Sequence, residues 1–281
     1  MKFKILTFLL VFLLLVSCNN RKYEKDQNSS DKLRIVSLTP SITKELVDLG
    51  VKDRIVGATS YCDITANNKD LIIGSAIAVN MEKILLLQPD IVFASGLTKD
   101  KTIQNLRDNG ITVYTLEKMN SYDAICDHFL KLAEYVDKKK VAVSMIKASK
   151  AKIESLVASI PKRSDSLHVF FQLGTKPIFT VIPNTFMNDY ITFAKCKNIA
   201  EDMTKGTINR EAVLNRNPDI IFIASMGIMG EKEKETWKQY PELKAAKNDK
   251  IFIIDANLAA IPTVPTFTES FEIMIKQIYN Q

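Results

Sequence analysis

The sequence predicts an α/β protein with two βαβ lobes, each built on a mainly parallel sheet, and one long helix that joins them. Three observations predict this fold. Apolar runs of strand length alternate with segments of helical period. A pattern of a short helix followed by a buried strand occurs twice, at 80–93 and at 209–222. Between the two copies, residues 138–160 form an unbroken helical segment, about 33 Å long at the rise of an α-helix.

The two copies of the repeat share residue types at the same offsets. Each has Asn first (Asn80, Asn209), Glu two residues later (Glu82, Glu211), and Pro-Asp before an apolar strand. Asn is favoured at a helix N-cap because its side-chain oxygen accepts a backbone N–H, and Glu in the first turn suits the helix dipole. A repeat of this length indicates two similar lobes, and a cleft between lobes is a favoured place for a small ligand.

Residues 1–17 predict a lipoprotein signal peptide. A basic start precedes an apolar stretch at 5–16, which is too short to cross a bilayer comfortably. Ser17 and Cys18 follow and match a bacterial lipobox, so Cys18 is the expected lipidation site. The alternative is an ordinary signal peptide that happens to contain a cysteine. Residues 18–31 are polar and predict a tether between the membrane and the folded part.

Charge, cysteine and histidine counts exclude several classes of function. The formal net charge is +6, and loss of Lys2 and Lys4 with the signal peptide lowers it to +4, which is too mild for a nucleic-acid partner. After Cys18 an odd number of cysteines remains, with no zinc-motif spacing, so buried free thiols are favoured over a disulfide. The two histidines cannot build a three-histidine metal site, and we expect no cofactor and no resident metal. The cysteines after Cys18 are Cys62, Cys126 and Cys196, and the two histidines are His128 and His168.

The N-terminal lobe is expected over 32–137 and opens with a buried strand at 33–38. Thr39 suits the N-cap of the next helix and Pro40 its first position, and Gly50 closes it. The further elements expected in this lobe are a strand at 54–57, the first repeat, a helix at 99–109, a strand at 111–114 and a helix at 121–136.

The connecting helix, 138–160, and the C-terminal lobe, 161–281, complete the chain. A helix joins lobes more stiffly than flexible strands do, so we expect only modest closure. The predicted buried stripe of this helix is Val141, Met145, Ala148, Leu156 and Ile160. The elements expected in the C-terminal lobe are strands at 168–173, 177–182 and 251–255, helices at 185–194 and 268–279, the second repeat, and a solvated helix start at the charge run 231–235.

The order and spacing of several segments resemble those of a known family. The segments are 34–43, 55–57, 61–63, and Glu82 with Pro89-Asp90, followed by the long helix. They resemble the class III periplasmic binding proteins of ABC importers for iron–siderophore complexes, haem and cobalamin, and most closely the cobalamin-binding members. The resemblance covers about 32–281 and implies the fold of the helical-backbone metal-receptor type, with a ligand between the lobes at the carboxyl ends of the strands.

The resemblance also implies two sets of functional residues. Glu82 and Glu211 match the glutamates with which the family docks on arginines of the permease; carboxylates that only stabilise their helices are the alternative. Tyr61 matches a ligand-contacting position of the cobalamin-binding members, where a phenol stacks on or hydrogen-bonds to a macrocycle, or else is a rim tyrosine. The expected ligand-lining residues, each with a structural loop role as the alternative, are Tyr61, Ser95, Gly96, Gln172, Thr175, Ser225, Met226 and Asn257.

Three stretches depart from the family pattern. Residues 74–78 and 204–208 lack the aromatic residues that the cobalamin-binding members place around the ligand. The loop 259–266 lacks the arginine of some siderophore binders. Cys196 matches a cysteine that forms a disulfide in a cobalamin-binding member, but the C-terminal helix has no partner cysteine. The ligand is therefore expected to be a corrinoid, a haem or a ferric siderophore, in no particular order.

The sequence thus predicts an exported, lipid-anchored solute-binding protein that faces the periplasm, acts as a monomer and delivers a chelated metal complex to an ABC permease. It contains no Gly-x-Ser-x-Gly, phosphate-binding loop or dinucleotide motif, and no plausible triad, so we expect no catalytic residues. The alternative function is a surface or periplasmic lipoprotein that uses the same fold for scavenging or protein binding without a permease.

Overall fold

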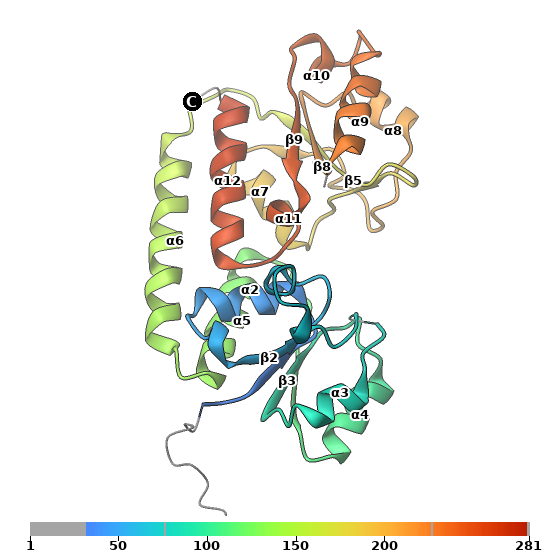
Figure 1. Ribbon diagram of the computed structural model, residues 1–281. Coiled ribbons are helices and arrows are strands. Elements are labelled where there is room, and N and C mark those ends of the chain that lie inside the picture. The colour runs from blue at the N-terminus through green and yellow to red at the C-terminus, as the bar shows by residue number, and fades with distance from the viewer. Residues whose placement is uncertain (1–31, 76, 226, 280–281) are drawn as a thin grey trace, which may run out of the picture. The chain divides into compact units, whose positions relative to one another are not determined.

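The computed structural model describes residues 32–75, 77–225 and 227–279 (Figure 1). The described residues from Leu33 onward cluster as one compact unit. The predicted signal peptide, the tether and Cys18 lie outside the described residues. Within the described ranges, no helix combines the length and the apolar character that crossing a membrane requires.

The first sheet is parallel throughout, as predicted. Its strand order is β2-β1-β3-β4, so that β1 pairs with both β2 and β3. Strand β3 is buried along its whole length, which explains why its sequence is an unbroken apolar run and does not alternate. The strands are β1 (Ile35–Ser37), β2 (Ile55–Ala58), β3 (Ile91–Ala94) and β4 (Thr112–Thr115); the helices are α2 (Pro40–Asp48), α3 (Met81–Leu86), α4 (Asp100–Asp108) and α5 (Tyr122–Tyr135), with 3₁₀ turns η1 (Lys52–Arg54), η2 (Asp63–Thr65) and η3 (Lys69–Leu71).

The second sheet is mainly parallel, with one antiparallel strand. Its order is β6-β5-β8-β9, with β7 also paired to β5, and β6 runs antiparallel to β5. The strands are β5 (His168–Leu173), β6 (Phe179–Thr180), β7 (Lys197–Asn198), β8 (Ile220–Ser225) and β9 (Ile251–Asp255); the helices are α7 (Phe186–Phe193), α8 (Arg210–Arg216), α9 (Ile228–Lys238), α10 (Lys244–Lys247), α11 (Ala256–Ala259) and α12 (Val264–Tyr279). The predicted α/β class with two mainly parallel sheets is confirmed.

Helix α6 (Lys139–Ser159) occupies the segment between the two sheets and packs against α5 and α12 (Figure 1). The predicted buried stripe is wrong at Val141 and Ala148, which are exposed. The helical residues that are buried are Ala142, Ser149 and Ile153. The face toward the core is therefore turned from the one that the spacing of apolar residues suggested.

A hydroxyl cluster explains which face of α6 is buried. The hydroxyl of Ser149 bonds to that of Tyr122 on α5 and to that of Thr268 on α12. Exposed Val141 and Val143 are as apolar as the buried residues, so hydrophobicity alone does not distinguish the faces. Contacts with α5 and α12 therefore help to fix which face of α6 is buried. The spacing of apolar residues within α6 cannot show these contacts.

The repeat forms the same helix start in both halves. The side-chain oxygen of Asn80 accepts the backbone N–H of Lys83 at 2.9 Å, and that of Asn209 accepts the N–H of Ala212 at 2.8 Å. Both predicted N-caps are confirmed. The predicted N-cap Thr39 and first helical residue Pro40 of α2 are confirmed as positions, although no side-chain bond caps that helix.

The aspartate of the repeat pins the beginning of the central strand in each sheet. Asp90 Oδ2 accepts the backbone N–H of Arg34 at 2.6 Å, just before β1. Asp219 Oδ2 accepts the N–H of His168 at 2.8 Å, at the start of β5. The Pro-Asp step thus ties each repeat copy to a strand that precedes it by more than fifty residues.

One apolar core contains side chains from both sheets and from the helices between them. Phe267 of α12 is fully buried in it, with its ring 4.5 Å from that of Tyr122 on α5 and 4.4 Å from that of Tyr190 on α7. Nearby, Asp189 Oδ2 accepts the backbone N–H of Tyr122 at 2.7 Å. Two further clusters pack α3 and α4 on the first sheet and α8 and α9 on the second.

The three cysteines among the described residues are free and buried, as predicted. Cys196 Sγ lies 3.9 Å from the hydroxyl of Tyr279 on α12, and that hydroxyl donates to the carbonyl of Ala194 at 2.6 Å. A tyrosine on the C-terminal helix therefore makes the contact at Cys196. Helix α12 itself starts at Val264, before the predicted Thr268.

Candidate functional site

Tyr61 lies in the loop that follows β2, with its side chain exposed to 74%. The backbone of this loop is held by polar contacts of the buried residue Cys62. The buried thiol of Cys62 lies 3.1 Å from the hydroxyl of Thr43 and 3.2 Å from that of Thr59, and the Thr65 hydroxyl donates to the Cys62 carbonyl at 2.7 Å. The fixed backbone holds the phenol of Tyr61 outward at the carboxyl edge of the first sheet.

Ser95 and Gly96 follow β3 at the same edge of the first sheet. Ser95 is buried, and its hydroxyl accepts the backbone N–H of Leu97 at 3.3 Å. Thr98 Oγ1 accepts the N–H of Ser95 at 3.4 Å. Gly96 is exposed, and a Cβ added to it would meet open space. Ser95 therefore shapes the turn, while Gly96 and Leu97 form its surface.

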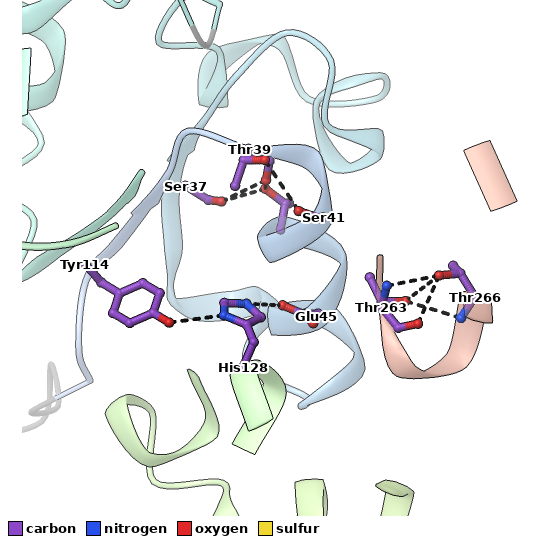
Figure 2. Close-up of polar contacts among 9 residues, drawn as sticks. Ser37, Thr39, Ser41, Glu45, Tyr114, His128, Thr263 and Thr266 are labelled. Atoms are coloured by element: carbon purple, nitrogen blue, oxygen red, sulfur yellow. Dashed lines mark hydrogen bonds and ion pairs between the residues drawn. The ribbon is translucent and has the colours of Figure 1, made fainter. Parts of the chain in front are cut away.

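A group of buried polar side chains joins α2, α5 and β4 (Figure 2). His128 Nε2 lies 2.9 Å from Glu45 Oε2, and His128 Nδ1 lies 3.1 Å from the hydroxyl of Tyr114. The Glu45 carboxyl and the Tyr114 hydroxyl thus partner the two ring nitrogens of His128. Burial raises the pKa of Glu45, and burial raises that of Tyr114 to about 12.

Two clusters of hydroxyl groups in the same region are also bonded internally. The Thr43 hydroxyl donates to Ser37 Oγ at 2.8 Å, and Ser37 Oγ donates to the Thr39 carbonyl at 3.2 Å. At the start of α12, the hydroxyls of Thr263 and Thr266 lie 2.9 Å apart (Figure 2). These pairings support a structural role for the clusters, as predicted for His128.

Ser225 and Asn257 line one depression of about 490 Å³ at the carboxyl edge of the second sheet. Asp255 lies between them, since it pairs in register with Ser225 across β8 and β9. Its carboxylate accepts the backbone N–H of Asn257 at 2.8 Å. The remaining lining residues are Gly227, Ile228, Glu231 and Ile253. The lining of the depression thus combines apolar and acidic side chains, and all of it comes from the second sheet's edge.

Two glycines bring α9 close to this depression. Gly227 has a φ of +144°, which a side chain would strain. A Cβ on Gly230 would lie 2.7 Å from the Cβ of Ser225, so only glycine lets α9 approach the end of β8 this closely. The predicted ligand residue Met226, between Ser225 and Gly227, lies outside the described residues.

Gln172 does not reach the surface, in contrast to its predicted place in the ligand wall. Its side chain is fully buried. Its amide nitrogen donates to the Gly174 carbonyl and to Glu233 Oε1, both at 2.9 Å, and its oxygen accepts from Trp237 Nε1 at 2.7 Å. Thr175, two residues after β5, is partly exposed at the sheet's edge. Of this pair, only Thr175 has surface that a ligand could contact.

Exposed apolar side chains surround these edges, and the sequence reasoning missed them. On the first sheet's side they include Ile77 and Leu97, and on the second sheet's side Phe179, Ile228 and Met229. Leu97 is exposed to 68% and Ile228 to 88%. Only Leu97 carried a signal in the sequence, its place in the loop directly after β3; Phe179 lies in β6, and Ile228 and Met229 begin α9. Such exposed side chains favour an apolar ligand surface.

Glu82 and Glu211 are the second residues of α3 and α8, and both are exposed. Each follows an N-capped turn, so the structure presents the two carboxylates in the same local geometry. Leu86, also exposed, lies one turn after Glu82, where the second copy has Asn215. The charge run at 231–235 differs from its prediction as a solvated stretch, because Glu233 is buried while its neighbours are not.

Among the described residues, no group of three or more histidine, cysteine, aspartate or glutamate side chains is arranged to hold a metal ion. The exposed surface at the strand ends consists of a phenol, apolar side chains, hydroxyls, an amide and the carboxylates of Glu231 and Asp255. This set can contact a ligand by stacking and hydrogen bonding. It offers a chelated metal a surface for its organic part.

Residues 35–258 match the family described as periplasmic binding protein. An uncharacterized ABC transporter substrate-binding lipoprotein of Bacillus subtilis, YvrC, is 27% identical to this chain and covers 96% of it and 95% of its own length. A vitamin B12-binding protein of Vibrio campbellii is 25% identical, with 85% and 87% covered. The matches take in both copies of the repeat and the helix between them.

Among solved structures, a possible iron-binding (periplasmic solute-binding) protein from Staphylococcus epidermidis superposes with a TM-score of 0.74. It is 28% identical to this chain, and the match covers 88% of this chain and 98% of that one. Most of this chain therefore has a counterpart in a solved structure.

Proposed function

Since this chain belongs to the periplasmic binding protein family, whose members act in transport and are not enzymes, we propose that it is the lipid-anchored substrate-binding protein of an ABC importer. Its cargo is a chelated metal complex: a corrinoid, a haem or a ferric siderophore. The vitamin B12-binding and possible iron-binding relatives support this ligand class. The ligand lies between the two sheets' carboxyl edges, the N-terminal lobe being 32–137 and the C-terminal lobe 161–281.

The observation that carries the ligand proposal is the set of exposed apolar side chains at both edges. Tyr61, Leu97 and Ile228 would lose water-exposed apolar surface on contact with a flat or bulky organic chelate. Acidic Glu231 and Asp255 beside Ile228 favour a ligand that is neutral or positive on that side. The loop 259–266 offers no basic residue, which argues against a strongly anionic siderophore.

A thermal-shift screen of the mature protein tests the ligand class. The panel contains cobalamin, cobinamide, haem and several ferric siderophores. A ligand at 100 times its dissociation constant should stabilise the fold by roughly 2.7 kcal/mol, which raises Tm by several degrees. Tyr61→Ala and Ile228→Ser should reduce the shift without lowering the Tm of the free protein. If no member of the panel raises Tm, the ligand class is wrong.

We further propose that Glu82 and Glu211 dock on basic residues of the permease. Their support is the matched position on two N-capped helices and their exposure. Paired carboxylate–guanidinium contacts orient a partner as well as bind it. Glu82→Lys with Glu211→Lys should abolish stimulation of the permease ATPase, while Glu154→Lys on exposed α6 should not. Unchanged stimulation in the double variant would favour the scavenging lipoprotein.

The anchor proposal rests on Cys18 and on the lipoprotein name of the Bacillus subtilis relative. Lipid on Cys18, followed by the polar residues 19–31, would hold the folded part near the membrane that contains the permease. A Cys18→Ala variant that stays in the membrane fraction would exclude this anchor.

A further inference from the structure

A buried charged network lies between α8, α9 and β5. Glu233 Oε1 accepts two hydrogen bonds, from Arg210 Nη2 at 2.6 Å and from Gln172 Nε2 at 2.9 Å. The amide oxygen of Gln172 in turn accepts from Trp237 Nε1 at 2.7 Å. The guanidinium carbon of Arg210 lies 4.2 Å from the centre of the Trp237 ring. Four side chains from three elements are thus bonded or stacked in one cluster.

This network is not an ordinary surface ion pair. The side chain of Glu233 is only 8% exposed and that of Arg210 24%. Removing a carboxylate from water is costly, and the cost is recovered only if its partners are well placed. Breaking one partner of such a pair leaves the other charge buried and uncompensated, so the geometry of all members is tightly constrained.

The two ends of the network lie at the two places where the protein is proposed to meet its partners. Arg210 is the first residue of α8 and directly precedes the docking residue Glu211. At the other end, Gln172 Nε2 also donates to the carbonyl of Gly174, the exposed residue after β5 at the carboxyl edge. Helix α9, which carries Glu233, begins beside the depression lined by Ser225.

The first copy of the repeat has no equivalent of this network. Where the second copy has Arg210, the first has Met81, whose side chain belongs to the apolar packing under α3. The difference is confined to one half, although both helices share the Asn cap and the exposed Glu. A requirement of the repeated fold would have appeared in both copies.

We propose that Arg210, Glu233 and Gln172 are positioning residues that hold Glu211 in a fixed orientation relative to the ligand-binding edge of the second sheet. The inference rests on the proposed docking function. Through Glu233, a ligand that contacts the Gly174–Thr175 turn alters the same carboxylate that orients the first turn of α8. Occupancy and docking are therefore linked in the C-terminal half, through groups that touch neither the ligand nor the permease.

The chain contains a single tryptophan, and it lies inside this network, which gives a direct optical readout. The Trp237 indole bonds to Gln172 and stacks under the Arg210 cation, so its emission depends on both. Ligand binding should change Trp237 emission although the residue is buried. That change should be lost when Glu233 is replaced by Gln, which keeps the shape of the side chain and removes its charge.

The deciding experiment measures affinity of the mature protein for its permease in lipid nanodiscs, with Glu233→Gln, Arg210→Met and Arg210→Lys. Arg210→Met installs the residue of the first repeat. We expect Glu233→Gln and Arg210→Met each to weaken docking by about two- to thirty-fold, and Arg210→Lys, which keeps the charge, to weaken it less. In a Glu211→Ala background, neither change should weaken docking further, because the residue they orient is gone.

Two results would overturn the inference while leaving the proposed docking function in place. One is unchanged docking in Glu233→Gln and Arg210→Met while Glu211→Lys abolishes docking, since the network would then be structural only. The other is an equal further loss in the Glu211→Ala background, which indicates general destabilisation. If Glu211→Lys itself has no effect, the proposed docking function fails, and the inference fails with it. Arg210→Lys and the emission of Trp237 decide the matter if Glu233→Gln does not fold.

Discussion

At the residue scale, the aspartates of the repeat carry an architectural role. The Pro-Asp step in each copy is visible in the sequence, but its purpose is not. Asp90 and Asp219 bond to backbone N–H groups of Arg34 and His168, which lie far back in the chain. A pattern within one segment cannot show a partner in another, so the repeat predicted the elements and not the bonds that join them.

Replacing Asp90 or Asp219 by Ala should lower the free energy of unfolding by about 1–3 kcal/mol, the usual cost of leaving a hydrogen-bonding group without its charged partner. Urea denaturation measures the change. Asp165→Ala is the matched control, because Asp165 makes only an exposed ion pair with Arg163 at 3.5 Å, and it should have almost no effect. Equal losses at all three aspartates would contradict the role of the strand bonds.

The buried Glu45 predicts a pH dependence of stability. Burial raises its pKa above the ordinary 4.5, against the opposing effect of His128. The folded state then holds the proton more tightly than the unfolded state. The stabilising contribution of the neutral carboxyl is complete below pH 4.5 and is lost as pH rises through the folded-state pKa.

Relative to Glu45→Gln, which cannot ionise, the wild-type protein should therefore lose stability as pH rises from 4.5 toward neutrality. Urea denaturation of both proteins across this range measures the difference. Asp189 also has a pKa raised by burial, but it is common to both proteins and cancels in the comparison. A difference that stays constant with pH would contradict the ionisation of Glu45.

The candidate site shows what the sequence can and cannot predict about single residues. The loops after the strands lie at the carboxyl edges of the sheets, as the alternation of strands and helices predicts. The burial of the Gln172 side chain was not predicted. Alternation along β5 places Gln172 on the same face of the sheet as Phe170, where Trp237 packs. The alternating positions of the strand could therefore have predicted that this side chain is buried.

At the scale of elements, the sequence predicted the long helices and central strands well, since capping residues and apolar runs mark their ends. The shortest elements, such as β7 and α10, were missed. They have two and four residues, too few for any periodicity, and they exist because neighbouring elements complete their hydrogen bonds. The buried face of α6 was also misjudged, because its contacts come from α5 and α12.

The corrected face of α6 predicts unequal effects of two similar substitutions. Ile153→Ala, on the buried face, should cost about 2–5 kcal/mol. Val141→Ala, at a position exposed to 39%, should cost far less, since little apolar surface is lost. Chemical denaturation of the two variants measures both values. A larger loss for Val141→Ala would restore the stripe suggested by the sequence.

At the scale of the whole molecule, two sheets share one core. Phe267 on α12 contacts the rings of Tyr122 on α5 and Tyr190 on α7. The largest apolar cluster contains side chains from strands of both sheets. The sequence suggested two lobes joined by a stiff helix. It did not show that α5, α7 and α12 would add their own packing to that connection, because those contacts join segments from both halves.

A shared core predicts that the described part of the protein unfolds in a single cooperative transition. Calorimetry should show one peak. Asp90→Ala in the first half and Asp219→Ala in the second should each move that whole peak to lower temperature. A trace with two peaks, of which each variant moves only one, would show that the halves unfold independently.

The core around Phe267 also limits how this architecture can be taken apart. Tyr122 lies in the first half of the chain, and Phe267, whose ring it contacts, lies in the second. A half produced alone would expose this aromatic surface to water and would tend to self-associate. The halves repeat one another in pattern, yet neither is a module. Any recombination that exchanges one half between relatives must carry matching surfaces on α5, α7 and α12.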